Sequence, residues 1–119
     1  MGWEKGRAVN EKLAVILTSA DQKVLEMGLI YAKNVVKHGW MSDTKLYLFG
    51  ASEVTIATDP ELRQHVKDII DLGTVPQACK WCSDKYRVSD LLAELGVDVE
   101  YIGEPVSEAI KAGYTPMTW

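Results

Sequence analysis

Short apolar runs alternate with longer segments of helical periodicity along this chain, and this alternation restricts the fold more than any other feature. The run at 12–17 (KLAVIL) is almost continuously apolar, as in a strand covered on both faces of a parallel sheet. The segment 21–38 then places apolar side chains at helical spacing and ends with basic residues before Gly39. We therefore predict a strand followed by a helix, with Thr18 and Ser19 as N-cap candidates.

The same unit recurs to the end of the chain. Further strands are predicted at 45–49, 75–78, 97–102 and 115–119. Further helices are predicted at 60–72, 90–95 and 106–112. Pro60 behind Asp59 fits a first helical position, and Ser89 is a candidate N-cap. Residues 51–58 fit a strand and a helical turn equally. The class is α/β, and five strands separated by helices predict a three-layer α/β/α sandwich with a parallel sheet and right-handed crossovers.

Length and composition fit one globular domain. The chain has 119 residues, 47% of them apolar and 25% charged. We interpret residues 1–11 as a loose, polar lead-in and residues 12–119 as the domain. The net charge of −4 lacks the basic character of a nucleic-acid binder, and no apolar run is long enough for a membrane span or a signal peptide. We expect a cytoplasmic protein with neither nucleic acid nor membrane as a partner.

Two cysteines three residues apart, Cys79 and Cys82, directly follow the predicted strand 75–78. Reacting groups gather at the carboxyl ends of parallel strands, where the N–H groups of a following helical turn favour a thiolate. Lys80 and Lys85 should act in the same direction. If the segment turns helically, Cys82 lies on the same side as Cys79. This pattern predicts redox, sulfur or metal chemistry rather than a disulfide scaffold.

Other interpretations compete with a reactive thiol pair. Free cysteines often serve only as small buried apolar residues. A structural zinc site needs four ligands, and the chain adds only His38 and His65, both distant in sequence, so zinc could bind only across subunits. We therefore assign no metal ligands within the chain. Paired carboxylates, a glycine-rich phosphate loop and a nucleophile elbow are all missing from the sequence, and no cofactor is expected.

Further polar and aromatic residues are weaker candidates for the site. Ser19 and Asp21 occupy the first strand-to-helix turn and could line the same sheet edge, although helix capping alone explains both. The tryptophans Trp40, Trp81 and Trp119 fit an interface and a core position about equally.

Residues 75–84 read Val-Pro-Gln-Ala-Cys-Lys-Trp-Cys-Ser-Asp. This segment resembles the DsrE/DsrF-like family, and especially its YchN-like branch, in which a Val-Pro strand leads into Cys-Lys-x-Cys-Thr/Ser-Asp. The resemblance extends over most of the chain as pattern more than identity. It implies a five-stranded parallel sheet of order 4-3-2-1-5 and assembly into homotrimers or homohexamers. In sulfur-relay members it also implies a cysteine that carries persulfide sulfur from a donor protein to an acceptor protein.

Counted along the motif, Cys79 matches the sulfur-carrying cysteine and Cys82 matches the second cysteine of the YchN-like branch. Three further motif residues are candidate substrate contacts, namely Lys80, Trp81 and Ser83. The sequence departs from the family pattern at Arg87, where the motif usually has glycine, and in a shorter stretch before the helix at 60–72. A thiol-disulfide redox protein and a non-catalytic oligomeric subunit are the alternative functions.

Overall fold

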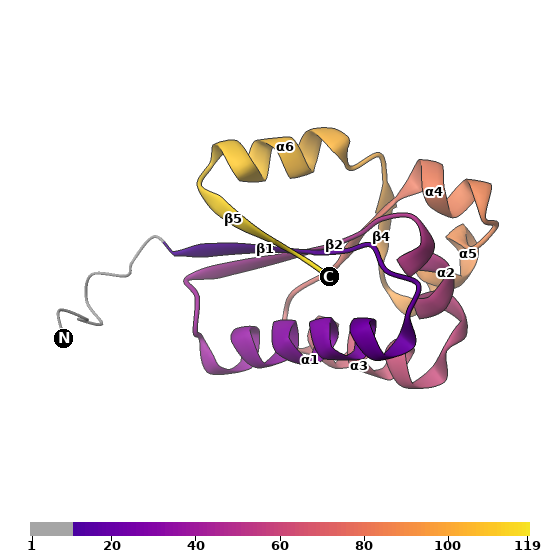
Figure 1. The fold of residues 1–119 in the computed structure, drawn as a ribbon, viewed down its shortest axis with the longest axis horizontal. Coiled ribbons are helices and arrows are strands. Elements are labelled where there is room, and N and C mark those ends of the chain that lie inside the picture. Colours follow the sequence, from indigo (N-terminus) through magenta and orange to yellow (C-terminus); the bar gives the residue numbers. More distant parts are fainter. Residues whose placement is uncertain (1–10) are drawn as a thin grey trace, which may run out of the picture.

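A five-stranded parallel sheet forms the centre of the computed structural model, which describes residues 11–119 (Figure 1). The strands are β1 (Lys12–Leu17), β2 (Asp43–Leu48), β3 (Gln77–Cys79), β4 (Asp98–Glu100) and β5 (Tyr114–Thr118). Their order is β4-β3-β2-β1-β5, which confirms the α/β class and the order that the family resemblance implied. The expected lead-in lies outside the described residues except for Glu11, whose carbonyl oxygen accepts a hydrogen bond from Ser42 N (2.7 Å).

Helices cover both faces of this sheet. They are α1 (Gln22–His38), α2 (Ala51–Thr58), α3 (Pro60–Asp71), α4 (Lys80–Lys85), α5 (Ser89–Leu95) and α6 (Gly103–Lys111). In Figure 1, α1 and α3 lie below the sheet and α6 lies above it, while α2, α4 and α5 gather at the end where the strands finish. The layers are those of the predicted sandwich. Within residues 11–119, no helix is both long enough and apolar enough to cross a bilayer.

The two faces of the sheet contribute unequally to the core. The larger cluster joins the strands to α1 and α3 and includes Leu17, Leu29, Leu48, Val66 and Ile69, all with 0% exposed surface. The smaller cluster lies on the other face and consists of Ala14, Tyr47, Ile102 and Ala109. Stability therefore depends mainly on the apolar faces of α1 and α3, whose spacing is visible in the sequence.

The ends of the two long helices follow local capping chemistry. The Asp21 side chain accepts from Lys23 N (2.8 Å) and Val24 N (3.1 Å), so Asp21 caps α1. The prediction of Thr18 or Ser19 as the cap was wrong, because the Thr18 hydroxyl donates to a distant carbonyl and Ser19 Oγ accepts from Asp21 N (3.0 Å). Gly39 ends α1 in the left-handed conformation, as predicted (φ 63°).

The helix at Pro60 begins as the sequence predicted. Asp59 Oδ1 accepts from Leu62 N (3.0 Å), and proline occupies the first helical position, where its missing N–H costs nothing. Residues 51–58, which the sequence left open, form the helix α2. Its buried side chains pack into the protein interior, and this packing outweighs the strand preference of its β-branched residues.

Several predicted boundaries shifted by a few residues. The strand expected at 75–78 is Gln77–Cys79, and the one expected at 97–102 is only Asp98–Glu100. The prediction that Ser89 caps α5 was wrong. Val88 occupies the N-cap position, and the Ser89 hydroxyl instead bonds Ser83 Oγ (2.7 Å) and Asp84 Oδ1 (2.5 Å). Gly96 ends α5 in the left-handed conformation, as expected (φ 104°).

Candidate functional site

Cys79 lies where strand β3 gives way to helix α4. It is the last residue of the strand and the N-cap of the helix, with extended backbone angles (φ −63°, ψ 115°). Cys82 follows within the first turn of α4, and both thiols are free and half-buried. The sequence placed Cys79 at the carboxyl edge of the sheet, and the structure has it there. The helical turn that the sequence analysis allowed for residues 79–83 is present as α4.

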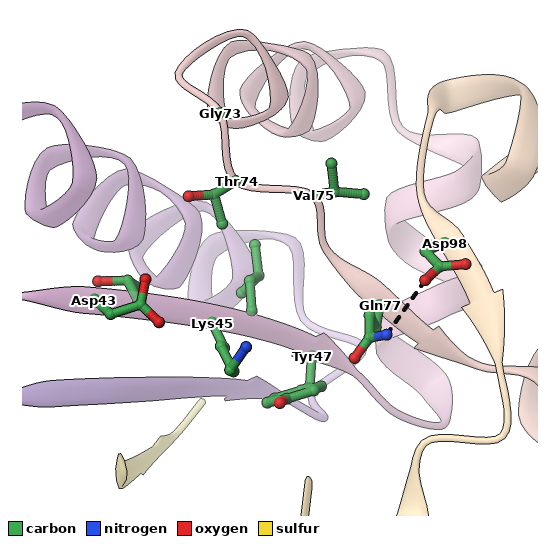
Figure 2. A pocket seen from close by; sticks show the side chains of 10 residues that line it. Asp43, Lys45, Tyr47, Gly73, Thr74, Val75, Gln77 and Asp98 are labelled. Carbon is green, nitrogen blue, oxygen red and sulfur yellow. Dashed lines mark hydrogen bonds between the residues drawn. The ribbon is translucent and has the colours of Figure 1, made fainter. Parts of the chain in front are cut away.

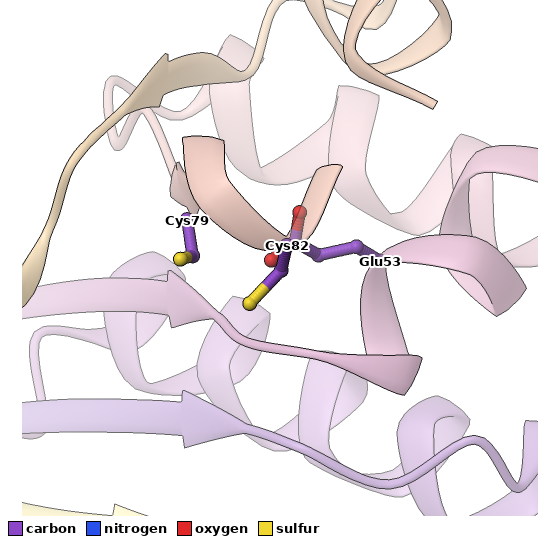
Figure 3. Close-up of side chains that lie close together, drawn as sticks. All are labelled: Glu53, Cys79 and Cys82. Atoms are coloured by element: carbon purple, nitrogen blue, oxygen red, sulfur yellow. The ribbon is translucent and has the colours of Figure 1, made fainter. Parts of the chain in front are cut away.

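A third side chain, that of Glu53, joins the two cysteines from helix α2. The two Sγ atoms and one carboxylate oxygen of Glu53 lie within 4.8 Å of one another (Figure 3). Helix α2 is held in place at its start, where the Ser52 hydroxyl makes hydrogen bonds to Leu17 O and Phe49 O (both 2.8 Å). The carboxyl ends of β1, β2 and β3 therefore meet at this cluster.

Glu53 is an acidic side chain in the protein interior. Its exposed fraction is 0%, and among residues 11–119 no group meets either carboxylate oxygen at full hydrogen-bond geometry. Burial raises the pKa of the Glu53 carboxyl to about 8, and the nearby backbone N–H groups of Cys79 and Gly50 offset this only in part. Such an orphaned buried carboxyl is costly, and its presence requires an explanation.

The two thiols differ in their surroundings. The pKa of the Cys82 thiol is raised to about 11, first by burial and then by its hydrogen bond with the Cys79 side chain. The charges of Cys79 and Glu53 act in the same direction, while the Gly50 N–H opposes them. Cys82 is therefore held as a thiol in the resting protein.

The two lysines near the thiols make contacts with other side chains. Lys80 Nζ pairs with Asp84 Oδ2 (2.7 Å) and lies 5.9 Å from the ring centre of Tyr101. Lys85 Nζ lies 5.1 Å from the ring centre of Trp81. From the sequence we expected both lysines to favour the thiolate of Cys79. Their contacts in the structure are with a carboxylate and two aromatic rings.

The remaining motif residues differ in how accessible they are. Trp81 is 62% exposed. Ser83 is fully buried, and its hydroxyl donates to Lys80 O (3.2 Å) and contacts Ser89 Oγ (2.7 Å). Ser83 thus ties α4 to α5. Trp81 is the motif side chain that an incoming partner can reach most easily.

The other sequence candidates lie apart from the thiol cluster. Ser19 and Asp21 hydrogen-bond within the turn before α1, and no hydrogen bond of the described chain joins either to the cysteine segment. Trp40 stacks on His38 (ring centres 5.4 Å apart) and Trp119 packs near Tyr31 (6.1 Å). Within residues 11–119, neither histidine joins the group of potential metal ligands around the cysteines.

Glu53 is the site residue that sequence reasoning missed. It belongs to the segment 51–58, for which helix and strand were equally acceptable. As a helix, that segment places Glu53 three and four residues before Ile56 and Ala57, on one buried face. A helical assignment would therefore have predicted a buried acid, but not that it lies beside the cysteines.

A separate hollow of about 320 Å³ opens at the amino ends of the strands (Figure 2). Its lining includes Asp43 and Tyr47 of β2 and Gln77 of β3, and Gln77 Nε2 donates to Asp98 Oδ2 (3.2 Å). Neither cysteine lines it. The thiol cluster and this hollow therefore occupy opposite ends of the strands.

Comparison with known proteins connects this fold to solved structures. No protein-family model and no curated protein matches the chain. A conserved protein of unknown function from Bacteroides thetaiotaomicron is 29% identical, with a TM-score of 0.84 over 94% of this chain and 97% of that one. The YchN protein of E. coli is 18% identical, with a TM-score of 0.73 over 92% of this chain and 99% of that one.

A protein of unknown function from Methanobacterium thermoautotrophicum gives the same TM-score of 0.73 at 14% identity, over 92% of this chain and 99% of that one. At 18% and 14% identity these likenesses concern the fold. The chain therefore has the fold of the YchN protein of E. coli over most of its length.

Proposed function

We propose that this protein is a persulfide carrier of the sulfur-relay type, with Cys79 as the residue that carries the sulfur atom. The observation that carries the proposal is the position of Cys79. It is a free, half-buried cysteine at the end of a parallel strand, with a second thiol beside it. The resemblance of residues 75–84 to the sulfur-relay family supplies the chemistry, since fold alone does not determine function.

The transfer consists of two displacement steps. The Cys79 thiolate attacks the outer sulfur of a donor persulfide, the donor's sulfur–sulfur bond breaks, and the donor thiolate leaves. Cys79 then carries one extra sulfur as a persulfide. A thiolate of an acceptor protein attacks that outer sulfur, and Cys79 leaves as a thiolate. Each step exchanges one sulfur–sulfur bond for another, so no external oxidant or reductant is needed.

Cys82 offers a second route for the loaded sulfur. If the Cys82 thiolate attacks Cys79 Sγ, a disulfide forms and hydrosulfide leaves, so that the sulfane sulfur is reduced while the two cysteines are oxidised. Because burial raises the pKa of the Cys82 thiol, this reaction should be slow near neutral pH. We therefore expect the persulfide on Cys79 to last long enough for transfer.

Intact-mass analysis tests the assignment. The reduced protein is incubated with glutathione persulfide, and we expect a gain of one sulfur atom that a thiol reductant removes. Cys79→Ser should lose this gain, whereas Cys82→Ser should keep it or accumulate more. Equal loading of Cys79→Ser and the unmodified protein would show that the nucleophile is misassigned.

A thiol-disulfide redox protein is the second candidate, favoured by the closeness of the two Sγ atoms. It predicts a loss of two hydrogen masses on mild oxidation and reversible dithiol–disulfide cycling with a protein substrate. Loading with persulfide sulfur would then be slow or transient. The same mass measurement therefore separates the two functions.

We also propose that the protein assembles as a homotrimer or homohexamer in the cytoplasm. Exposed aromatic side chains surround the thiol segment, namely Trp81 (62%), Tyr86 (42%) and Tyr101 (67%). Aromatic residues are enriched in protein interfaces, and a neighbouring subunit seated here would cover the thiol segment. Light scattering tests the assembly, and a monomer at micromolar concentration would exclude a site shared between subunits.

A further inference from the structure

The cluster of Glu53, Cys79 and Cys82 has the composition of a metal site. It contains two sulfur donors and one oxygen donor, from α2 and from the junction of β3 with α4, and the three donor atoms lie within 4.8 Å of one another. In a tetrahedral zinc site, with bonds of about 2.3 Å to sulfur and about 2.0–2.2 Å to oxygen, the donors lie about 3.5–3.8 Å apart. The three donor atoms would have to approach one another by about 1 Å from the observed upper limit of 4.8 Å to reach that geometry.

The burial of Glu53 is an independent reason to expect a ligand at this point. Its carboxyl group is 0% exposed and adjacent to the thiols (Figure 3), and no group among the described residues meets it at full hydrogen-bond geometry, although the backbone N–H groups of Cys79 and Gly50 lie near enough to lower its pKa. A buried polar group without a partner is expensive, and native proteins rarely retain one without cause. A cation between the carboxylate and the thiolates would supply the missing partner.

We propose that Glu53, Cys79 and Cys82 together bind one Zn²⁺ ion per chain. Cysteine thiolates and glutamate carboxylates are both zinc ligands, and the three-residue spacing of the cysteines is typical of zinc ligands. The chain supplies three ligands, and because both cysteines are half-buried rather than enclosed, the fourth position faces solvent and takes water. Binding releases the ligand protons to solvent.

The proposal replaces the zinc interpretation drawn from sequence. That interpretation required ligands from a second subunit, because only His38 and His65 were considered beside the thiols. The structure brings a carboxylate of the same chain to the cysteines, so a neighbouring subunit is unnecessary.

Zinc and sulfur would compete for Cys79. A thiolate that is coordinated to zinc is a weaker nucleophile, so the metal-bound protein should not accept sulfur until the ion leaves. This competition rests on the proposed carrier function, whereas metal binding itself does not. A protein that binds zinc and never loads sulfur would refute the carrier function alone.

Cobalt provides a direct test on the full chain, reduced, freed of metal with a chelator and kept without oxygen. Titration with Co²⁺ should give a near-ultraviolet thiolate charge-transfer band and visible bands of a tetrahedral ion, both saturating at one ion per chain. Zn²⁺ should then displace the cobalt. Cys79→Ser and Cys82→Ser should each lose about half of the charge-transfer intensity.

Glu53→Gln is the decisive variant, because it keeps both thiols and nearly the same side-chain shape. We expect it to bind Co²⁺ and Zn²⁺ about tenfold more weakly or worse, with altered visible bands. Glu94→Gln, which changes an exposed carboxylate on α5, is the matched control and should bind like the unmodified protein. Glu53→Gln binding as tightly as the control would overturn the proposal, and so would an unmodified protein without a charge-transfer band.

X-ray absorption on the zinc-loaded unmodified protein gives a measurement that does not depend on any variant folding. We expect two sulfur neighbours at about 2.3 Å and oxygen neighbours at about 2.0–2.2 Å. Four sulfur neighbours would place the ion between two chains and would refute the site within one chain.

Discussion

Replacing Gly28 by alanine should destabilise the protein, although alanine is the better helix former. Gly28 is buried in α1, where the helix crosses the end of β1. A Cβ atom added there would lie 2.9 Å from Leu17 Cδ2 and 3.0 Å from Trp119 Cγ. Overpacking costs about 1–3 kcal/mol, and the gain in helix propensity returns about 1 kcal/mol. Since Leu17 is fully buried and the indole ring is rigid, the overpacking cost should fall in the upper part of that range, about 2–3 kcal/mol, which leaves a net loss of about 1–2 kcal/mol.

Urea denaturation followed by circular dichroism measures this loss as a lower midpoint at unchanged slope. Gly103→Ala is the matched control, because a Cβ atom there meets nothing within 4 Å, and its stability should change by less than about 0.5 kcal/mol. In a Trp119→Ala background the cost of Gly28→Ala should shrink, since part of the crowding is removed. A Gly28→Ala protein as stable as the unmodified one, or an equal cost in both backgrounds, would refute the reasoning.

Three further predictions concern Glu53, Arg87 and Asp59. In metal-free protein, stability should fall by about 3 to 5 kcal/mol as pH rises from 4.5 to 8, because the unfolded carboxyl ionises at the lower value and the folded one at about 8. Glu53→Gln should lack this fall in urea titrations across pH, and an equal slope would contradict the assignment. Arg87→Gly should stabilise the protein by about 0.5–1 kcal/mol and so raise its thermal midpoint, because Arg87 has a positive φ of 60°, which glycine adopts without steric cost. Asp59→Ala should cost about 1 kcal/mol in urea unfolding by removing the α3 cap, and no loss would argue against that cap.

Local chemistry explains which parts of the fold could be predicted from sequence. Asp59 and Pro60 mark the start of α3 through contacts that span only four residues. The apolar run of β1 can likewise be recognised without knowledge of a distant partner. Ser89 shows the opposite case, because its hydroxyl meets Ser83 and Asp84 instead of its own helix. Side chains with several possible partners are therefore the ones that sequence reasoning places wrongly.

The same distinction separates the parts of the candidate site. Cys79 and Cys82 lie three residues apart, so their closeness follows from one helical turn. Glu53 lies 26 residues before Cys79 in the chain and reaches the thiols because α2 packs at the carboxyl end of the sheet. The pairing of Lys80 with Asp84 is also local, at a spacing typical of helical ion pairs, and could have been predicted from that spacing.

The two outer strands of the sheet have a consequence for how copies of the protein can meet. β4 has only three residues, and two of them, Asp98 and Glu100, are acidic. On β5, Trp119 N donates to Ile16 O, so by alternation the backbone at position 116 faces away from β1, and Pro116 has no N–H to offer there. Short, charged or proline-containing edges are poor templates for another strand. Ordered assemblies of this protein should therefore form through helices and loops. Neither edge strand favours the pairing with strands of other copies that fibril formation requires.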